Sequence, residues 1–233
     1  MPRYRRILLK LSGEALGEGG QGLSWERLSS LGGELAEARK RGTELALVVG
    51  GGNILRGASA KALDRVRADY MGMLATFINA LALEEVLKQA GVPARVLSAL
   101  SVEGVGEPFH RERALEYLAR GEILILACGT GNPLFTTDTA AVLRALELRA
   151  EVLFKGTKVD GVYEEDPVKN PAARKYDYLS YEEVLEKGLG VMDLTAITLA
   201  REHHLPVLVF NMLKSGNIVR AVSGETVGTL IGG

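Results

Sequence analysis

Residues 44–53 read Glu44-Leu45-Ala46-Leu47-Val48-Val49-Gly50-Gly51-Gly52-Asn53, an uninterrupted apolar run that leads into three glycines. A run without polar alternation is typical of a strand covered on both faces, as in the parallel sheets of α/β proteins. Short apolar runs of this kind recur along the chain. We expect strands over Tyr4–Leu11, Glu44–Val49, Ala94–Ser98, Glu122–Ala127, Glu151–Lys155 and Val207–Asn211.

Longer segments with helical patterning lie between these strands. Ser180 and Glu183 have the spacing of a capping box, which predicts a further short helix over Tyr181–Glu186. Alternating strands and helices indicate an α/β fold, with an open, mainly parallel sheet and helices on both sides. The longer expected helices are Ser24–Arg41, Leu63–Ala90, Arg111–Arg120, Asp138–Leu148 and Asp193–His203.

The composition suits one large domain or two closely packed lobes, with 233 residues of which 47% are hydrophobic. The net charge of −1 provides no overall field for nucleic acid or anionic lipid, so any anion-binding surface must be local. Cys128 is the only cysteine, which excludes an internal disulfide framework and fits a reducing cytoplasm. The early apolar run Ile7-Leu8-Leu9 is too short for a signal peptide. We expect a cytoplasmic protein without a membrane-spanning segment.

Glycine-rich turns follow four of the expected strands, at the edge where open α/β sheets bind ligands. Any one of them could simply close a strand–helix connection. Three also carry Lys or Arg, and successive backbone N–H groups in such turns form anion-binding concavities. Together they predict a polyphosphate site. The turns are Lys10-Leu11-Ser12-Gly13-Glu14, Gly50-Gly51-Gly52-Asn53 with Arg56-Gly57, Gly129-Thr130-Gly131-Asn132-Pro133, and Lys155-Gly156-Thr157-Lys158-Val159-Asp160-Gly161.

Several other kinds of site are not indicated by the sequence. It contains no G-x-x-x-x-G-K-[ST] motif, no full G-x-G-x-x-G after the first expected strand, and no metal-ligand spacing. His203 and His204 close an expected helix, where histidine is favoured by the helix dipole. Cys128 is expected to be a small core residue rather than a nucleophile.

The ordered set of turns resembles the amino acid kinase superfamily and, within it, the bacterial UMP kinases. The resemblance covers nearly the whole chain, and the block from Asp69 to Thr76 distinguishes UMP kinases from relatives that act on carboxylates. The matching blocks are Lys10–Leu16, Gly50–Asn53 with Arg56-Gly57, Asp69–Thr76, Gly129–Asp138, Lys155–Tyr163 with Asp166-Pro167, Val191–Ala196 and Val209–Met212.

The resemblance implies a three-layer α/β/α sandwich and a single domain over residues 1–233. The acceptor, UMP, is expected on the side formed by about residues 1–150, and ATP on the side formed by about 151–233. Similarity assigns ATP binding to Lys10, Leu11, Ser12, Gly13, Gly52, Arg56, Thr157, Tyr163 and Asp166. It assigns UMP binding to Gly51, Asp69, Thr130, Gly131, Asn132, Pro133, Leu134, Phe135, Thr136 and Thr137.

The resemblance also implies Mg²⁺ as the cofactor that accompanies ATP, a homohexamer, and a place in pyrimidine nucleotide biosynthesis. It suggests GTP as an activator and UTP as an inhibitor, and no requirement for nucleic acid or a membrane. The loop that matches the GTP-linked region is short and rich in glycine here, and it comprises Glu18, Gly19, Gly20, Gln21, Gly22 and Leu23.

Phosphoryl transfer depends mainly on alignment and on neutralising charge. Lys10 and Arg56 are expected to neutralise the two phosphates, and the planar fork of arginine can hold two oxygens at once. Asp138 is expected to orient the lysines or the metal ion. Lys155 or Lys158 would stabilise the transferring group, and the sequence does not distinguish between them.

Plainer interpretations of these residues remain open from the sequence alone. Asp138 could be a helix-start carboxylate, and Asp69 a solvated residue in a charged helical stretch. Alternative functions on the same fold are a carboxylate or carbamate kinase, and a non-catalytic nucleotide-binding assembly with a storage or regulatory role.

Overall fold

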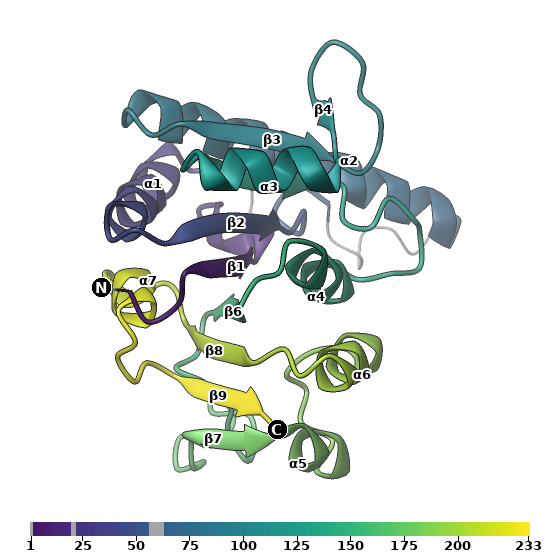
Figure 1. The fold of residues 1–233 in the computed structure, drawn as a ribbon. Helices are drawn as coiled ribbons and strands as arrows, with labels where there is room; N and C mark the ends of the chain where they lie inside the picture. Colours follow the sequence, from purple (N-terminus) through teal and green to yellow (C-terminus); the bar gives the residue numbers. More distant parts are fainter. Residues whose placement is uncertain (1, 20–21, 56–62) are drawn as a thin grey trace.

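The computed structural model describes residues 2–19, 22–55 and 63–233, and these form one nine-stranded sheet with helices on both faces (Figure 1). The strands are β1 (Arg6–Leu11), β2 (Glu44–Val49), β3 (Ala94–Ser98), β4 (Glu107–Pro108), β5 (Ile123–Ala127), β6 (Val152–Thr157), β7 (Tyr178–Ser180), β8 (Val207–Asn211) and β9 (Thr229–Gly232). The helices are η1 (Gly13–Ala15, a 3₁₀ turn), α1 (Trp25–Lys40), α2 (Arg65–Gln89), α3 (Arg111–Ala119), α4 (Thr137–Glu147), α5 (Tyr181–Glu186), α6 (Leu194–Glu202) and α7 (Asn217–Val222).

The sheet has the strand order β4-β3-β5-β2-β1-β6-β8-β9-β7. Neighbouring strands are parallel except β8 and β9, which pair antiparallel. The mainly parallel open sheet predicted from the apolar runs is therefore confirmed, and its central strands β1 and β2 begin and end within two residues of the expected bounds.

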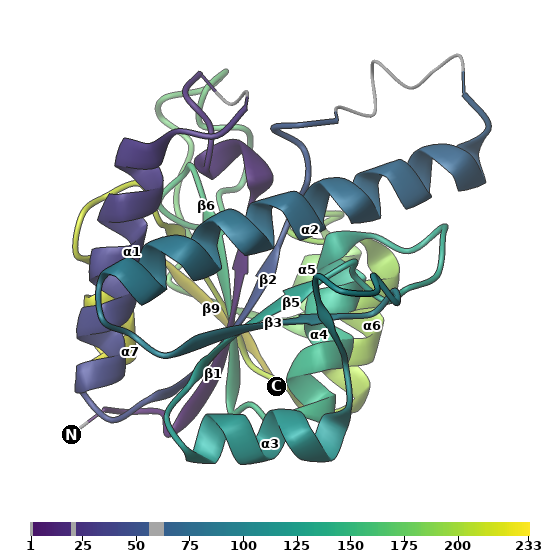
Figure 2. The ribbon, with the colours of Figure 1, turned by 90° about the horizontal axis from the view of Figure 1, so that it is seen from above.

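Helices cover the sheet in two layers. In Figure 2, α1, α2 and α7 lie on one face, and α3, α4, α5 and α6 lie on the other. Alternate residues of β1 serve the two layers, because successive strand side chains point to opposite faces. Leu9 joins the core beneath α1, α2 and α7, whereas Leu8 joins the core beneath α3 to α6. The three-layer α/β/α sandwich is confirmed.

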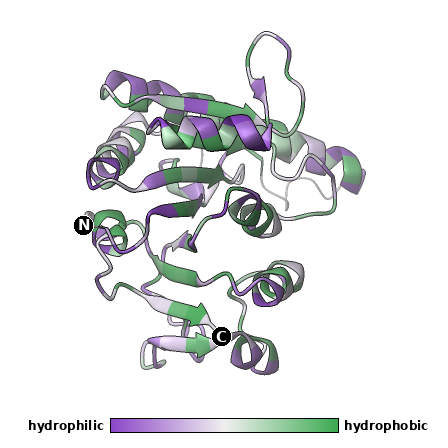
Figure 3. Ribbon diagram, in the orientation of Figure 1, coloured by the Kyte–Doolittle hydropathy of each residue, from purple (hydrophilic) through white to green (hydrophobic). Residues whose placement is uncertain are grey.

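The central strands are largely hydrophobic, while the helices carry hydrophilic stretches (Figure 3). This pattern explains the uninterrupted apolar runs, because β2 is buried on both faces from Leu45 to Val49. Polar caps define the helix starts: Ser180 and Glu183 form the predicted capping box of α5, and Thr136 caps α4.

The long helix α2 is apolar and long enough to cross a membrane by length and composition, although no membrane span was expected. More than half of its most apolar window is buried within the protein, as in a core helix. Core packing was expected for Met71, Met73, Leu74, Phe77 and Ile78 of this helix, with an interface as the alternative. Met73 and Phe77 are buried, whereas Met71, Leu74 and Ile78 are exposed, so the expectation is wrong for those three.

Five short elements were not predicted, namely η1, β4, β7, β9 and α7. Three of these, β4, β7 and β9, are two to four residues long and lie at or next to the sheet edges. Helix α7 has six residues and follows Gly216, whose φ of 82° is left-handed. Such elements depend on pairing with distant segments rather than on a long local pattern.

Candidate active site

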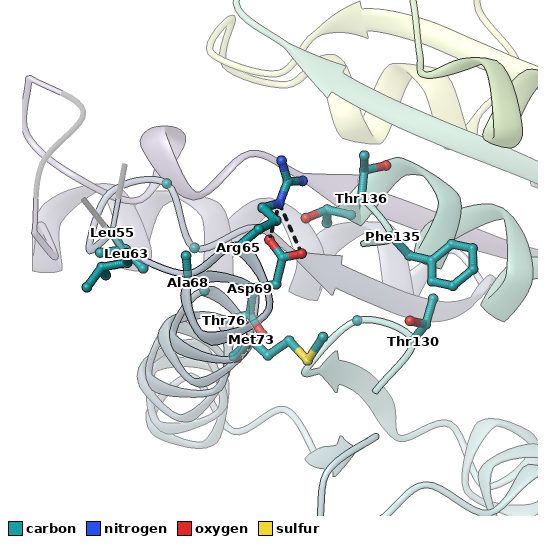
Figure 4. A pocket seen from close by; sticks show the side chains of 15 residues that line it. Leu55, Leu63, Arg65, Ala68, Asp69, Met73, Thr76, Thr130, Phe135 and Thr136 are labelled. Atoms are coloured by element: carbon teal, nitrogen blue, oxygen red, sulfur yellow. Dashed lines mark hydrogen bonds and ion pairs between the residues drawn. The ribbon is translucent and has the colours of Figure 1, made fainter. Parts of the chain in front are cut away.

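A cavity of about 570 Å³ lies at the carboxyl ends of β2 and β5, where the glycine turns lie. It is lined by the turn after β2, the first half of α2 and the loop from Gly129 to Thr137 (Figure 4). All four of Gly51, Asp69, Thr130 and Thr136 contribute to its wall, so residues far apart in sequence meet where UMP was expected.

Asp69 joins α2 to the opposite wall of this cavity. Its carboxylate accepts hydrogen bonds from Arg65 Nε at 3.0 Å and from the backbone N–H of Leu134 at 2.7 Å. Leu134 has a φ of 72°, a conformation uncommon for a leucine. Asp69 is therefore a structured residue that holds the loop, rather than the solvated helix carboxylate that its charged surroundings also allowed.

The remaining residues of the loop differ in what they offer to a ligand. Phe135 lines the cavity and leaves about half of its side-chain area exposed. Thr130 Oγ1 and Asn132 are hydrogen-bonded to each other within the turn. Gly131, Asn132, Pro133 and Leu134 do not line the cavity wall, although they belong to the predicted UMP set.

Two lysines lie side by side next to the cavity. Lys10 of β1 and Lys155 of β6 are register partners in the sheet, and Asp138 of α4 lies between their ammonium groups. Lys155 Nζ is 2.6 Å from Asp138 Oδ2, and Lys10 Nζ is 3.2 Å from Oδ1. One carboxylate thus compensates two cations in this lysine cluster and leaves a positive charge, which suits phosphate oxygens.

Lys155 is held on two sides. Its ammonium also donates a hydrogen bond to the carbonyl of Val191, and only 12% of its side chain is exposed. Burial lowers the pKa of Lys155, Asp138 opposes that change, and the charge of Lys10 adds to the lowering. Lys158 differs, since its side chain is about half exposed and pairs with Glu14.

A second cavity, of about 380 Å³, lies beyond the end of β6. It is lined by Thr157, Tyr163 and Asp166, three of the residues expected to bind ATP, together with Val191. Asp166 Oδ1 accepts the N–H of Val168 at 3.0 Å and so shapes the turn that follows. Asp138 follows Thr137 of the first cavity, and Lys155 bonds the carbonyl of Val191 of the second, so the lysine cluster adjoins one wall residue of each cavity.

The turns after β1 and β2 touch closely. A Cβ atom on Gly13 would lie 2.6 Å from the carbonyl oxygen of Gly50 and 2.8 Å from the N atom of Gly52, which explains the need for glycine there. Leu11 is fully buried, and its carbonyl accepts the N–H of Gly50 at 2.9 Å. Leu11, one of the residues predicted to bind ATP, could therefore contact a ligand only through its backbone.

A family model described as the amino acid kinase family matches residues 5–211. The chain belongs to the amino acid kinase family. Among solved structures, the UMP kinase from Bacillus anthracis is similar at 40% identity and a TM-score of 0.96, covering 100% of this chain and 97% of that one. The UMP kinase from Ureaplasma parvum is 35% identical, with a TM-score of 0.94 over 99% and 100% of the two chains. The uridylate kinase from Archaeoglobus fulgidus is 29% identical, with a TM-score of 0.76 over 99% and 100%.

The kinase structure adds one site residue that was not selected from the sequence. Asp193 lay within a block that matched the family, and it caps α6 by accepting the N–H of Ala196 at 3.0 Å. The same carboxylate accepts the hydroxyls of Thr136 and Thr139, and so ties α6 to the start of α4. Burial raises the pKa of Asp193, but these hydrogen bonds outweigh it and hold the pKa below its usual value.

Some predicted residues lie outside the described residues, namely Arg56, Gly20 and Gln21. Of the other residues in the predicted effector loop, Gly22 is tied to the turn after β2: its N–H donates to the carbonyl of Asn53 at 2.9 Å. Glu18, Gly19 and Leu23 belong to the same loop and do not line the cavities described above.

The donor groups of the kinase site fit a metal ion that arrives on phosphate rather than one held in a protein cage. Within residues 2–19, 22–55 and 63–233, no group of three or more acidic, histidine or cysteine side chains is placed to hold a metal ion. In the same part of the chain, no side chain or backbone group donates a well-directed hydrogen bond to Asp138 Oδ1. Its contact with Lys10 is an ion pair at 3.2 Å, and the oxygen itself is buried.

Proposed function

We propose that this kinase transfers the γ-phosphoryl group of ATP to UMP and forms ADP and UDP. The observation that carries the proposal is the lysine cluster of Lys10, Asp138 and Lys155, which adjoins one wall residue of each cavity. Transfer needs donor and acceptor phosphates to approach in line despite their charge, so cations belong at the junction. The likeness to solved UMP kinases over the full chain supports UMP as the acceptor.

The acceptor is assigned to the larger cavity, within about residues 1–150. Asp69 would accept the ribose hydroxyls, and Gly51 with Thr130–Thr137 would form the rest of the UMP site. Because Asp69 already accepts the N–H of Leu134, a bound ribose would share or displace that hydrogen bond. The exposed ring of Phe135 offers an apolar surface to the base.

ATP is assigned to the smaller cavity, mainly within residues 151–233. Thr157, Tyr163 and Asp166 would contact the adenosine. Ser12, Gly13 and Gly52 would lie along the phosphates, with Gly52 on the wall of the larger cavity. The turns after β1 and β2 support this, because they pack directly on each other at the strand ends, where glycine-rich backbone can approach phosphate closely.

Charge neutralisation is assigned to Lys10, Lys155 and Arg56, with Asp138 as the residue that orients the two lysines. Asp138 has no role as a base, because the UMP phosphate is already anionic. Mg²⁺ bound with ATP would offset the charge of the phosphate oxygens, and Asp138 would be the carboxylate available to it, with water as most of its other ligands. Lys155 rather than Lys158 would stabilise the transferring group, since only Lys155 belongs to the lysine cluster.

The assembly is proposed to be a homohexamer acting in cytoplasmic pyrimidine nucleotide biosynthesis, with GTP as an activator and UTP as an inhibitor. Helix α2 supports self-association, because it exposes apolar side chains at regular helical spacing. Of the helix residues considered for an interface, Met71, Leu74 and Ile78 are exposed. The stripe also includes Val66 and Tyr70.

The test is a panel of acceptors assayed for ADP formation with MgATP, comprising UMP, CMP and acetylglutamate. We expect UMP-dependent turnover that exceeds the rate with either alternative. Preference for acetylglutamate would refute UMP as the acceptor and leave the family assignment intact. Binding of ATP and UMP without turnover would identify a nucleotide-binding assembly instead.

A further inference from the structure

Two buried amide side chains lie beneath the turn that follows β2. Asn53 ends the Gly50–Asn53 turn, and Asn79 lies in the middle of α2; they are 5% and 0% exposed. Asn53 Nδ2 donates to Asn79 Oδ1 at 2.9 Å, and Asn79 Nδ2 donates to Asn53 Oδ1 at 2.7 Å. The two residues thus form a reciprocal amide pair.

Each amide also holds a backbone carbonyl. Asn79 Nδ2 donates to the oxygen of Gly50 at 2.7 Å, and Asn53 Nδ2 donates to the oxygen of Gly22 at 2.6 Å. A carbonyl can only accept, so these contacts fix which end of each amide is nitrogen. All four amide N–H groups of the pair are used, which satisfies the demand that buried donors be bonded.

The amide pair lies against both glycine turns of the proposed phosphate region. A Cβ on Gly13 would come within 2.6 Å of Asn53 Oδ1, so the turn after β1 packs directly on the amide. Gly51 packs against α2 with similar closeness, since its Cβ would lie 2.8 Å from the carbonyl oxygen of Gly72. The turn has little room to shift while the pair is intact.

We propose that Asn53 and Asn79 are positioning residues that fix the backbone of the phosphate-binding turn and link it to the loop at Gly22. The inference rests on the proposed function for its kinetic consequence, but its structural part stands alone. Asn79 holds the turn through its hydrogen bond to the Gly50 carbonyl. Asn53 links Gly22 to the same turn through two hydrogen bonds, one from its side chain to the Gly22 carbonyl and one from the Gly22 N–H to its own carbonyl.

The test compares Asn79→Asp with Leu83→Ala, a matched control one turn further along α2. Leu83 is fully buried in the same core and touches neither turn in the contacts above. Asn79→Asp replaces the donor by an oxygen that repels the Gly50 carbonyl, at nearly the same size. We expect kcat to fall about tenfold or more with KM for both nucleotides changed less than threefold, because the groups that act in the transition state are displaced. At temperatures where the variant is folded, Leu83→Ala should keep kcat within twofold of the wild-type value.

Hydrogen exchange over residues 50–54 provides a readout that does not need activity. Exchange should accelerate about tenfold in Asn79→Asp and stay unchanged in Leu83→Ala, when both are compared at equal distance from their unfolding temperatures. Equal exchange and equal kcat in the two variants would overturn the proposal. If the wild-type protein does not phosphorylate UMP, the proposed function fails and the exchange comparison still decides the positioning role.

Asn53→Ala keeps the test usable if Asn79→Asp fails to fold. It removes the side-chain bond to Gly22 but leaves the bond from Asn79 to Gly50, so a smaller fall in kcat of about threefold is expected. The double variant Asn53→Ala/Asn79→Ala should lower kcat little more than Asn79→Ala alone does, because the two amides act as one unit. Fully additive effects would contradict the link.

Discussion

The end of β6 and the loop that follows it each carry a lysine, and the two lysines differ in almost every physical respect. Lys155 is 12% exposed and bonded to Asp138 and to the Val191 carbonyl, whereas Lys158 is 53% exposed and paired with Glu14. They are three residues apart, so the sequence alone does not separate them. The sheet register does, because it sets Lys155 beside Lys10 and leaves Lys158 beyond the strand.

Removal of the buried lysine should give the largest effect. Lys155→Ala is expected to lower kcat by roughly a hundredfold or more, since it deletes a preorganised charge in the lysine cluster that adjoins both cavities. Steady-state kinetics with saturating MgATP and UMP measures it. A kcat within threefold of wild type would remove Lys155 from the mechanism, and Lys10→Ala provides the matched comparison on the neighbouring strand.

Removal of the shared carboxylate should give the next largest effect. Asp138→Asn leaves Lys10 and Lys155 adjacent with their charges uncompensated, so we expect about 2 kcal/mol lower stability, less than for a fully buried pair. We also expect kcat to fall by roughly tenfold, because the lysines separate. Urea unfolding and kinetics measure the two effects. Unchanged stability would show that the cluster does not depend on Asp138.

The pH dependence of activity should distinguish the roles of Lys155 and Lys158 without removing either side chain. Burial lowers the pKa of Lys155, so its ammonium loses a proton below pH 10.5, the ordinary lysine value. Activity that needs this charge should therefore decline on the alkaline side below pH 10.5. Between the folded pKa and 10.5 the unfolded chain binds more protons, so this group makes stability rise with pH there. Lys155→Arg should move the alkaline decline to higher pH, whereas Lys158→Arg should leave it in place.

The exposed lysine should give the smallest effect. Lys158→Ala removes a surface ion pair that contributes less than about 1 kcal/mol to stability, and kcat is expected to stay within threefold. The same unfolding and kinetic measurements apply. A loss as large as that of Lys155→Ala would reverse the assignment of the two lysines.

Much of the sheet could be predicted because its central strands are buried on both faces and therefore read as continuous apolar runs, as β2 does. The glycine turns could be predicted because their residue types are a local feature of the sequence. The short elements β7, β9 and α7 could not be predicted, because pairing with distant segments stabilises them rather than their own pattern.

The candidate site was only partly predictable. Lys10, Asp69 and Asp138 were found from motifs, and the structure places Asp138 between the two lysines. The amide pair of Asn53 and Asn79 was missed because its members are 26 residues apart and each alone is an ordinary polar residue. Asp193 was missed as a site residue because a helix cap explains it locally, while its bonds to Thr136 and Thr139 come from the fold.

We propose that the phosphoryl group passes from ATP to UMP at the lysine cluster, which adjoins both cavities. A single-turnover experiment with ATP labelled at the γ-phosphate tests it most directly. We predict label in UDP for the wild type and for Lys158→Ala, and loss of nearly all transfer for Lys155→Ala with both nucleotides still bound. Label transferred equally by all three proteins, or found in no UDP at all, would contradict the account.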